Sequence, residues 1–133
     1  MLFRSLAYRH ELWMGWLRTT LAAHGAPGHA PLQALVAAMG AWFQREDFRG
    51  CAFLNATAEL GATSPEVMAL VRAHKADMAK ALASLLPPGA GRAARSRALA
   101  MAVDGAILQA QMGLPVDAVL DGLRTLAQPL CRA

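Results

Sequence analysis

Glycine and proline breaks divide this 133-residue chain into six segments, and that division limits its fold more than any other feature. Between the breaks Ala, Leu, Met and Arg predominate and β-branched residues are few, a composition typical of helices. The pattern predicts an all-α bundle of about six helices, at about residues 3–23, 31–45, 51–59, 64–86, 90–112 and 115–130. The first helix is expected to stop at residues 24–28. The length suits a single domain, residues 1–133.

Several helix ends carry local chemical signals. Ser64 is placed to cap a helix whose first position is Pro65, and Glu66 then lies favourably at the positive end of the helix dipole. Pro31 marks the start of the second helix in the same way. The run Pro87-Pro88-Gly89 ends the fourth helix, because proline cannot continue the backbone hydrogen-bond ladder.

The chain carries more apolar surface than a small single subunit usually hides. Hydrophobic residues make up 56% of it and charged residues only 17%. The longest uninterrupted apolar run, residues 34–43, is ten residues long, whereas a bilayer span needs about 20. We therefore expect no membrane association, and expect a subunit interface or an apolar pocket to cover the surplus.

Charged residues and cysteines narrow the function classes further. The net charge is +4, but the basic residues are scattered, and the one cluster (Arg92, Arg95 and Arg97) has no interleaved aromatics, which favours a solvated helix face over nucleic-acid binding. Cys51 and Cys131 have no metal-ligand spacing, so free thiols in a reducing, cytoplasmic setting are expected. No phosphate loop, nucleophile motif or paired carboxylates occur, so the sequence predicts no metal, cofactor or enzymatic activity.

The helix expected at residues 90–112 has two apolar stripes. One contains Met101, Gly105, Leu108 and Met112, and the other contains Val103 and Ile107. A helix that is apolar on two sides is buried on two sides, so one stripe is predicted to face a second subunit. Together with the last helix it predicts a homodimer built as a four-helix bundle. The residues predicted for that interface are Met101, Asp104, Gly105, Leu108, Gln109, Met112, Val119, Leu123 and Leu126.

A block at residues 48–59, Phe-Arg-Gly-Cys-Ala-Phe-Leu-Asn-Ala-Thr-Ala-Glu, resembles one found in many TetR-family transcriptional regulators of bacteria. The segments at residues 71–75 and 103–110 and the closing amphipathic helix fit the same pattern in the same order. The resemblance implies the effector-binding and dimerisation domain of a cytoplasmic repressor that senses a small, mostly apolar ligand. Nothing before Trp13 resembles a helix-turn-helix, so DNA binding is expected only through an N-terminal domain missing from this sequence.

The resemblance also directs attention to aromatic, Met and polar residues on the central helices. Aromatic residues at helical spacing commonly form part of the hydrophobic core and bind nothing. The resemblance favours a pocket instead, because similar regulators enclose their ligand among the corresponding helices. Asn55 and Glu59 share a helix face and are candidates to orient a ligand. The alternative is that they make structural hydrogen bonds, or that the Glu59 carboxylate is simply solvated at the surface. The predicted ligand-binding residues are Trp13, Trp16, Leu17, Met39, Trp42, Phe43, Phe53, Asn55, Glu59, His74 and Met78.

Two other functions are open at this stage. One is a ligand-free helical dimerisation module, which would dimerise with full-length regulators and thereby inhibit their DNA binding. The other is a small helical enzyme, an interpretation that requires Cys51, His74 and Glu59 to converge on one cleft.

Overall fold

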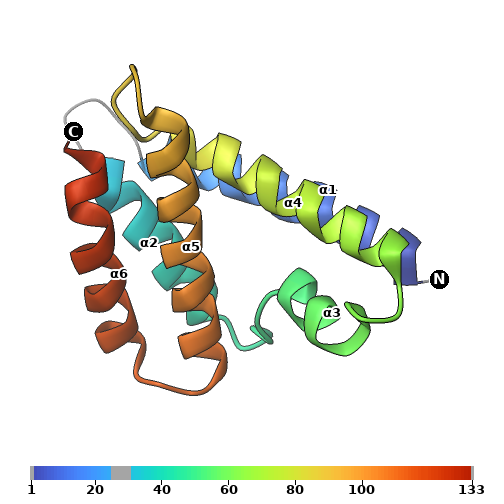
Figure 1. The fold of residues 1–133 in the computed structure, drawn as a ribbon. Coiled ribbons are helices and arrows are strands. Elements are labelled where there is room, and N and C mark those ends of the chain that lie inside the picture. The colour runs from blue at the N-terminus through green and yellow to red at the C-terminus, as the bar shows by residue number, and fades with distance from the viewer. Residues whose placement is uncertain (1, 25–30, 133) are drawn as a thin grey trace.

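The structure is a computed structural model that describes residues 2–24 and 31–132, and these residues form an all-α fold (Figure 1). Each predicted helix is present, with ends within three residues of the expected ones, while the predicted break after His24 lies outside the described residues. The six helices in the described part are α1 Leu2–His24, α2 Pro31–Phe43, α3 Ala52–Leu60, α4 Pro65–Ala83, α5 Arg92–Gln111 and α6 Val116–Cys131.

The helices form a bundle that is thicker at one end. α1 and α4 lie side by side, while α2, α5 and α6 group together at the end where α1 finishes (Figure 1). The short α3 packs against α4 and α1 near the other end of that pair. α2 also contacts α6, which closes the group. Within the described ranges, no helix has the length and apolarity that a bilayer crossing requires.

The hydrophobic core runs the length of α1 and α4 and continues between α2, α5 and α6. α2 is buried on most of its surface, as its nearly all-apolar sequence predicts. Burial of these apolar side chains is the main favourable term for the fold. The largest fully buried apolar side chains are Leu6, Leu17, Leu35, Met39, Met78, Leu82, Leu99, Val103, Ile107 and Leu123.

Helix ends are held by the side chains that local chemistry favours. The Ser64 hydroxyl accepts a hydrogen bond from the backbone N–H of Val67 at 3.3 Å, so the predicted N-cap is confirmed.

The cluster of Arg92, Arg95 and Arg97 differs from the solvated helix face that the sequence predicts. Arg92 donates to the Ala83 carbonyl at 2.8 Å and Arg95 to the Pro87 carbonyl at 3.2 Å. Arg92 therefore satisfies a carbonyl at the C-terminal end of α4 and Arg95 one in the segment that follows it, and only Arg97 of the cluster is exposed.

The two stripes of α5 have opposite environments. Val103 and Ile107 are buried in the core, whereas Met101, Leu108 and Met112 are 73%, 49% and 60% exposed. Large apolar side chains exposed to this extent on one helix face are typical of a surface that binds another protein. The structure holds one copy of the chain, so dimerisation through this face stays a prediction, as it does for the exposed Gly105, Gln109 and Leu126.

Two residues predicted for the dimer surface lie in the core, and a third, Asp104, already has a charged partner. Val119 and Leu123 are 8% and 2% exposed, because α6 turns that face toward α2 and α5 of its own subunit. Asp104 accepts a hydrogen bond from the Lys75 ammonium of α4 at 2.7 Å, so its charge already has a partner inside the subunit. Val119 and Leu123 are thus core residues of the subunit, a correction to the sequence prediction, whereas an interface role of Asp104 stays a prediction.

Candidate ligand-binding site

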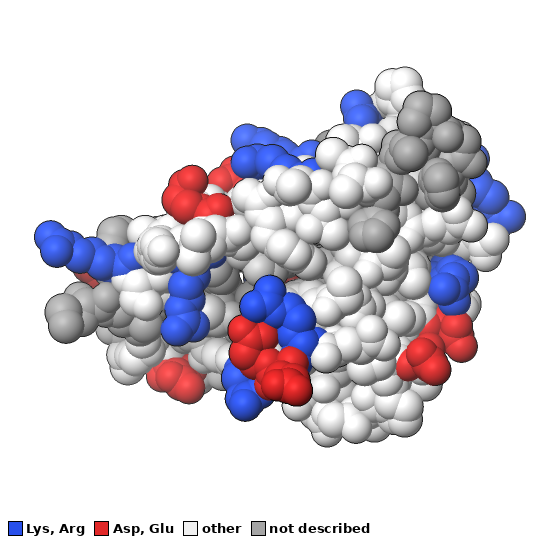
Figure 2. All heavy atoms as spheres, turned by 180° about the vertical axis from the view of Figure 1, so that it is seen from behind, with Lys and Arg blue, Asp and Glu red and all other residues white. Residues whose placement is uncertain are grey.

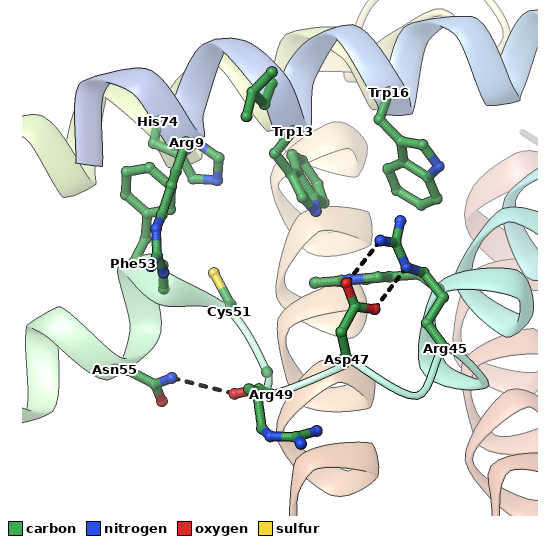
Figure 3. Close-up of a pocket in the computed structure, with 14 residues that line it drawn as sticks. Arg9, Trp13, Trp16, Arg45, Asp47, Arg49, Cys51, Phe53, Asn55 and His74 are labelled. Carbon is green, nitrogen blue, oxygen red and sulfur yellow. Dashed lines mark hydrogen bonds and ion pairs between the residues drawn. The ribbon is translucent and has the colours of Figure 1, made fainter. Parts of the chain in front are cut away.

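A cleft of about 570 Å³ lies between α1, the corner that follows α2, the start of α3, and α4 (Figure 3). A volume of this size suits a small organic molecule. Exposed side chains at its edge, including Leu12 and Arg45, leave it open to solvent. It is lined by Arg9, Leu12, Trp13, Trp16, Trp42, Arg45, Asp47, Arg49, Gly50, Cys51, Ala52, Phe53, Asn55 and His74.

Three indole rings form one wall of the cleft. The ring centroid of Trp13 lies 6.1 Å from that of Trp16 and 5.7 Å from that of Trp42, and the last two are 5.9 Å apart. We call Trp13, Trp16 and Trp42 the indole triad. It includes every tryptophan of the chain. The indole nitrogen of Trp13 is buried and has no hydrogen-bond acceptor among the described residues, an arrangement that costs about 1–3 kcal/mol.

A histidine stacked on a phenylalanine forms the opposite end of the aromatic surface. The rings of His74 and Phe53 are parallel within 3°, with centroids 3.6 Å apart. His74 is 1% exposed, and burial, helped by the nearby charges of Lys75 and His10, lowers its pKa to about 3. His74 is therefore neutral at physiological pH and adds aromatic surface without charge.

His74 also ends a chain of polar contacts that links α1 to α4. The Nδ1 atoms of His10 and His74 lie 2.8 Å apart, and Nε2 of His10 lies 3.1 Å from a carboxylate oxygen of Asp77. Both contacts are satisfied when His10 donates from Nε2 to Asp77 and accepts at Nδ1 from His74. The chain gives a buried polar ring the partner that burial requires.

The corner between α2 and α3 supplies the charged edge of the cleft. Arg45 forms a two-pronged pair with Asp47, with both N···O distances 2.9 Å, and its hydrogen bond and charge lower the pKa of the Asp47 carboxyl. Arg49 donates to the backbone carbonyls of Glu46 and Phe48 at 3.0 and 2.8 Å. Arg9, on α1, extends toward the start of α3 (Figure 3) and has no hydrogen-bond or ion-pair partner among the described residues.

Gly50 and Asn55 each have a structural role in this corner. Gly50 has φ of +85°, a conformation that favours glycine, and a Cβ there would also require the end of the Gln111 side chain to move. The Asn55 amide accepts from Gln111 at 2.9 Å and donates to the Arg49 carbonyl at 3.4 Å. Asn55 therefore ties α3 to α5 and to the corner, and its polar atoms are already engaged.

The structure divides the residues that the sequence predicted for ligand binding into three groups. Glu59 is exposed and outside the cleft, because it lies just over one helical turn beyond Asn55, farther along α3 from the cleft. The members that line the cleft are Trp13, Trp16, Trp42, Phe53, Asn55 and His74. Those found instead in the closed core, as a correction to the prediction, are Leu17, Met39, Phe43 and Met78.

The sequence prediction missed the charged members of the site. Arg9 precedes Trp13 by four residues, which places both on one face of α1, and this spacing was the available signal. Arg45, Asp47 and Arg49 are brought to the cleft by the corner, whose path has no periodic signal. On the face shown in Figure 2, basic and acidic side chains lie next to one another in mixed groups, with uncharged surface between the groups.

The three residues named in the enzyme alternative, Cys51, His74 and Glu59, do not converge on this cleft. Cys51 and His74 both line the cleft, but Glu59 does not. The Lys75 ammonium lies 3.5 Å from the Cys51 sulfur, and both cysteines are free thiols. Among the described residues, no group of three or more His, Cys, Asp or Glu is placed to hold a metal ion.

The fold and cleft define a class of protein: an all-α bundle with an aromatic-lined cleft between its first and fourth helices. The structure is similar to the crystal structure of a TetR-family transcriptional regulator from Streptomyces coelicolor, with a TM-score of 0.70 and 25% sequence identity. The match covers 96% of this chain and 71% of the other. The chain thus has the fold of a TetR-type regulator, and the resemblance seen in the sequence is confirmed.

At the level of sequence, a scan of protein-family models finds no match, and neither does a search of curated proteins.

Proposed function

We propose that this chain is the effector-binding and dimerisation part of a TetR-type transcriptional regulator, and that a small, mostly apolar molecule binds in the aromatic cleft. The observation that carries the proposal is the cleft itself, where the indole triad and the stacked pair Phe53–His74 enclose a space of ligand size. The similarity to a regulator of this family supports the same function. The proposal assigns no contact with DNA to the residues of this chain.

Ligand binding would act on α1, because Trp13 and Trp16 belong to it. α1 packs along α4, and the His10–His74 contact joins the two helices. A ligand that separates Trp13 and Trp16 from the α3 side of the cleft would displace α1 along α4. A domain attached before α1 would follow that displacement. The shift cannot exceed the difference in the ligand's affinity for the two positions of α1.

We expect a thermal-shift screen of small aromatic and apolar compounds to find molecules that raise the melting temperature. A ligand present at a hundred times its Kd stabilises the folded state by about 2.7 kcal/mol. Trp16→Ala, which removes one of the three rings of the indole triad, is expected to abolish the shift. Tyr8→Ala is the matched control, because Tyr8 is on the same helix but is exposed and outside the cleft. If no compound stabilises the protein at up to about 1 mM, effector binding is refuted.

The dimer part of the proposal rests on the exposed apolar face of α5 and α6, formed by Met101, Leu108, Met112 and Leu126. We expect sedimentation analysis to show a dimer. Leu108→Glu is expected to raise the dimer Kd at least tenfold, about 1.4 kcal/mol, because the symmetric contact buries the new charge twice.

Tyr8→Glu is the control for that experiment, since it places the same charge on an exposed residue of α1. Helical circular dichroism of Leu108→Glu should match that of the wild type, which separates dissociation from unfolding. If the wild-type chain stays monomeric at about 100 μM, the predicted dimer is refuted. A stable dimer that binds no ligand would instead support the ligand-free dimerisation module.

A further inference from the structure

The charges that line the cleft are unbalanced. Three guanidinium groups (Arg9, Arg45 and Arg49) face one carboxylate, Asp47, so the formal charge of the lining is three minus one, or +2, with His74 neutral. The pair between Arg45 and Asp47 uses the one carboxylate. Arg9 and Arg49 therefore form no ion pair with the residues lining the cleft.

Arg9 is the arginine best placed to meet a ligand. Its side chain extends from α1 toward Phe53 at the start of α3, next to the stacked pair (Figure 3). It has no hydrogen-bond or ion-pair partner among the described residues, so all of its N–H donors are available. Arg49 differs, because one of its nitrogens is engaged by two backbone carbonyls.

The surface beside Arg9 is aromatic without interruption. The Phe53 ring stacks on His74, and the His74 centroid lies 5.3 Å from that of Trp13. Trp13 continues this surface into the indole triad. Rings arranged in this way offer both flat faces and edges to a planar ligand. The indole N–H of Trp13, which has no acceptor among the described residues, is a further unused donor on a residue that lines the cleft.

We propose that the ligand of this cleft is a planar aromatic anion of the arylcarboxylate class, with its ring against the aromatic wall and its carboxylate on Arg9. This inference rests on the proposed function, because it specifies the effector of the same cleft. An aromatic cation would be repelled by the +2 lining and would find Asp47 already paired. A guanidinium matches a carboxylate in geometry as well as in charge.

Three probes of the same ring system and different charge test this proposal by isothermal titration calorimetry: indoleacetate, skatole and tryptamine. We expect indoleacetate to bind at least tenfold more tightly than neutral skatole, and cationic tryptamine to bind most weakly. The advantage of indoleacetate over skatole is expected to shrink as salt is added, because the Arg9 side chain is near solvent.

Arg9→Gln is expected to weaken indoleacetate binding about tenfold and to leave skatole binding unchanged. Arg4→Gln is the matched control, since Arg4 is exposed on the same helix and does not line the cleft. Both positions are exposed, so circular dichroism should show an intact fold for both variants.

The outcomes separate this inference from the proposed function. Equal binding of indoleacetate and skatole, or tightest binding of tryptamine, would overturn the anion assignment while keeping the cleft as a binding site. The assignment is equally overturned if none of the three probes binds although the thermal screen finds another ligand. If neither the probes nor the screen yield a ligand, both the inference and the effector-binding function fail.

Discussion

Leu17→Ala is expected to lower the free energy of unfolding by about 2–5 kcal/mol, measured by urea denaturation. Leu17 is 0% exposed in the core, so truncation removes buried apolar area and leaves a cavity. Leu12→Ala on the same helix is the matched control, with an expected change within about 0.5 kcal/mol, because Leu12 is 58% exposed.

The same pair of variants tests how the structure divides core from cleft. Leu17 was predicted from the sequence to bind ligand, whereas the structure places it outside the cleft lining. A Leu17→Ala protein as stable as the wild type, yet unable to bind a ligand that the wild type binds, would restore the sequence-based assignment.

Acidification from about pH 8 to about pH 5 is expected to cost about 2 kcal/mol of stability through His74 alone. The pKa of His74 is about 3 in the folded protein and near 6.5 when the chain is unfolded. Below pH 6.5 the unfolded state therefore takes up a proton that the folded state does not. The stability contributed by neutral His74 is present above that pH and is lost progressively down to about pH 3.

Urea denaturation at the two pH values, on the wild type and on His74→Gln, measures this effect. The variant is expected to be less stable overall, because it loses the ring stacked on Phe53. Its stability should nevertheless depend less steeply on pH, and that difference in slope is the diagnostic result. Equal slopes for the two proteins would show that the environment of His74, with His10, Lys75 and Asp77 around it, does not keep the ring neutral.

The helices were predictable because their signals are local. Ser64 and Pro65 act within one turn of the helix they start, and Pro87-Pro88-Gly89 interrupts the backbone whatever surrounds it. The two-sided character of α5 could also be read from periodicity, since Val103 and Met101 lie on different faces of one helix.

The assignment of each face to core, cleft or open surface was not predictable in the same way. Leu17 and Trp13 are four residues apart on α1, yet one is closed in the core and the other lines the cleft. Leu123 and Leu126 are close neighbours on α6, yet only Leu126 is exposed. Periodicity groups residues by face but does not say which neighbouring helix meets that face.

The sequence by itself determined the all-α class, the positions of the helices and the aromatic character of the cleft residues, because backbone propensity, caps and breaks act over a few residues. Only the tertiary structure decided which side chains share the cleft. His10 and His74 are 64 positions apart, and the arginines meet the indole triad across three segments of the chain. Such contacts depend on how the helices pack, and helix packing leaves no pattern in any single segment.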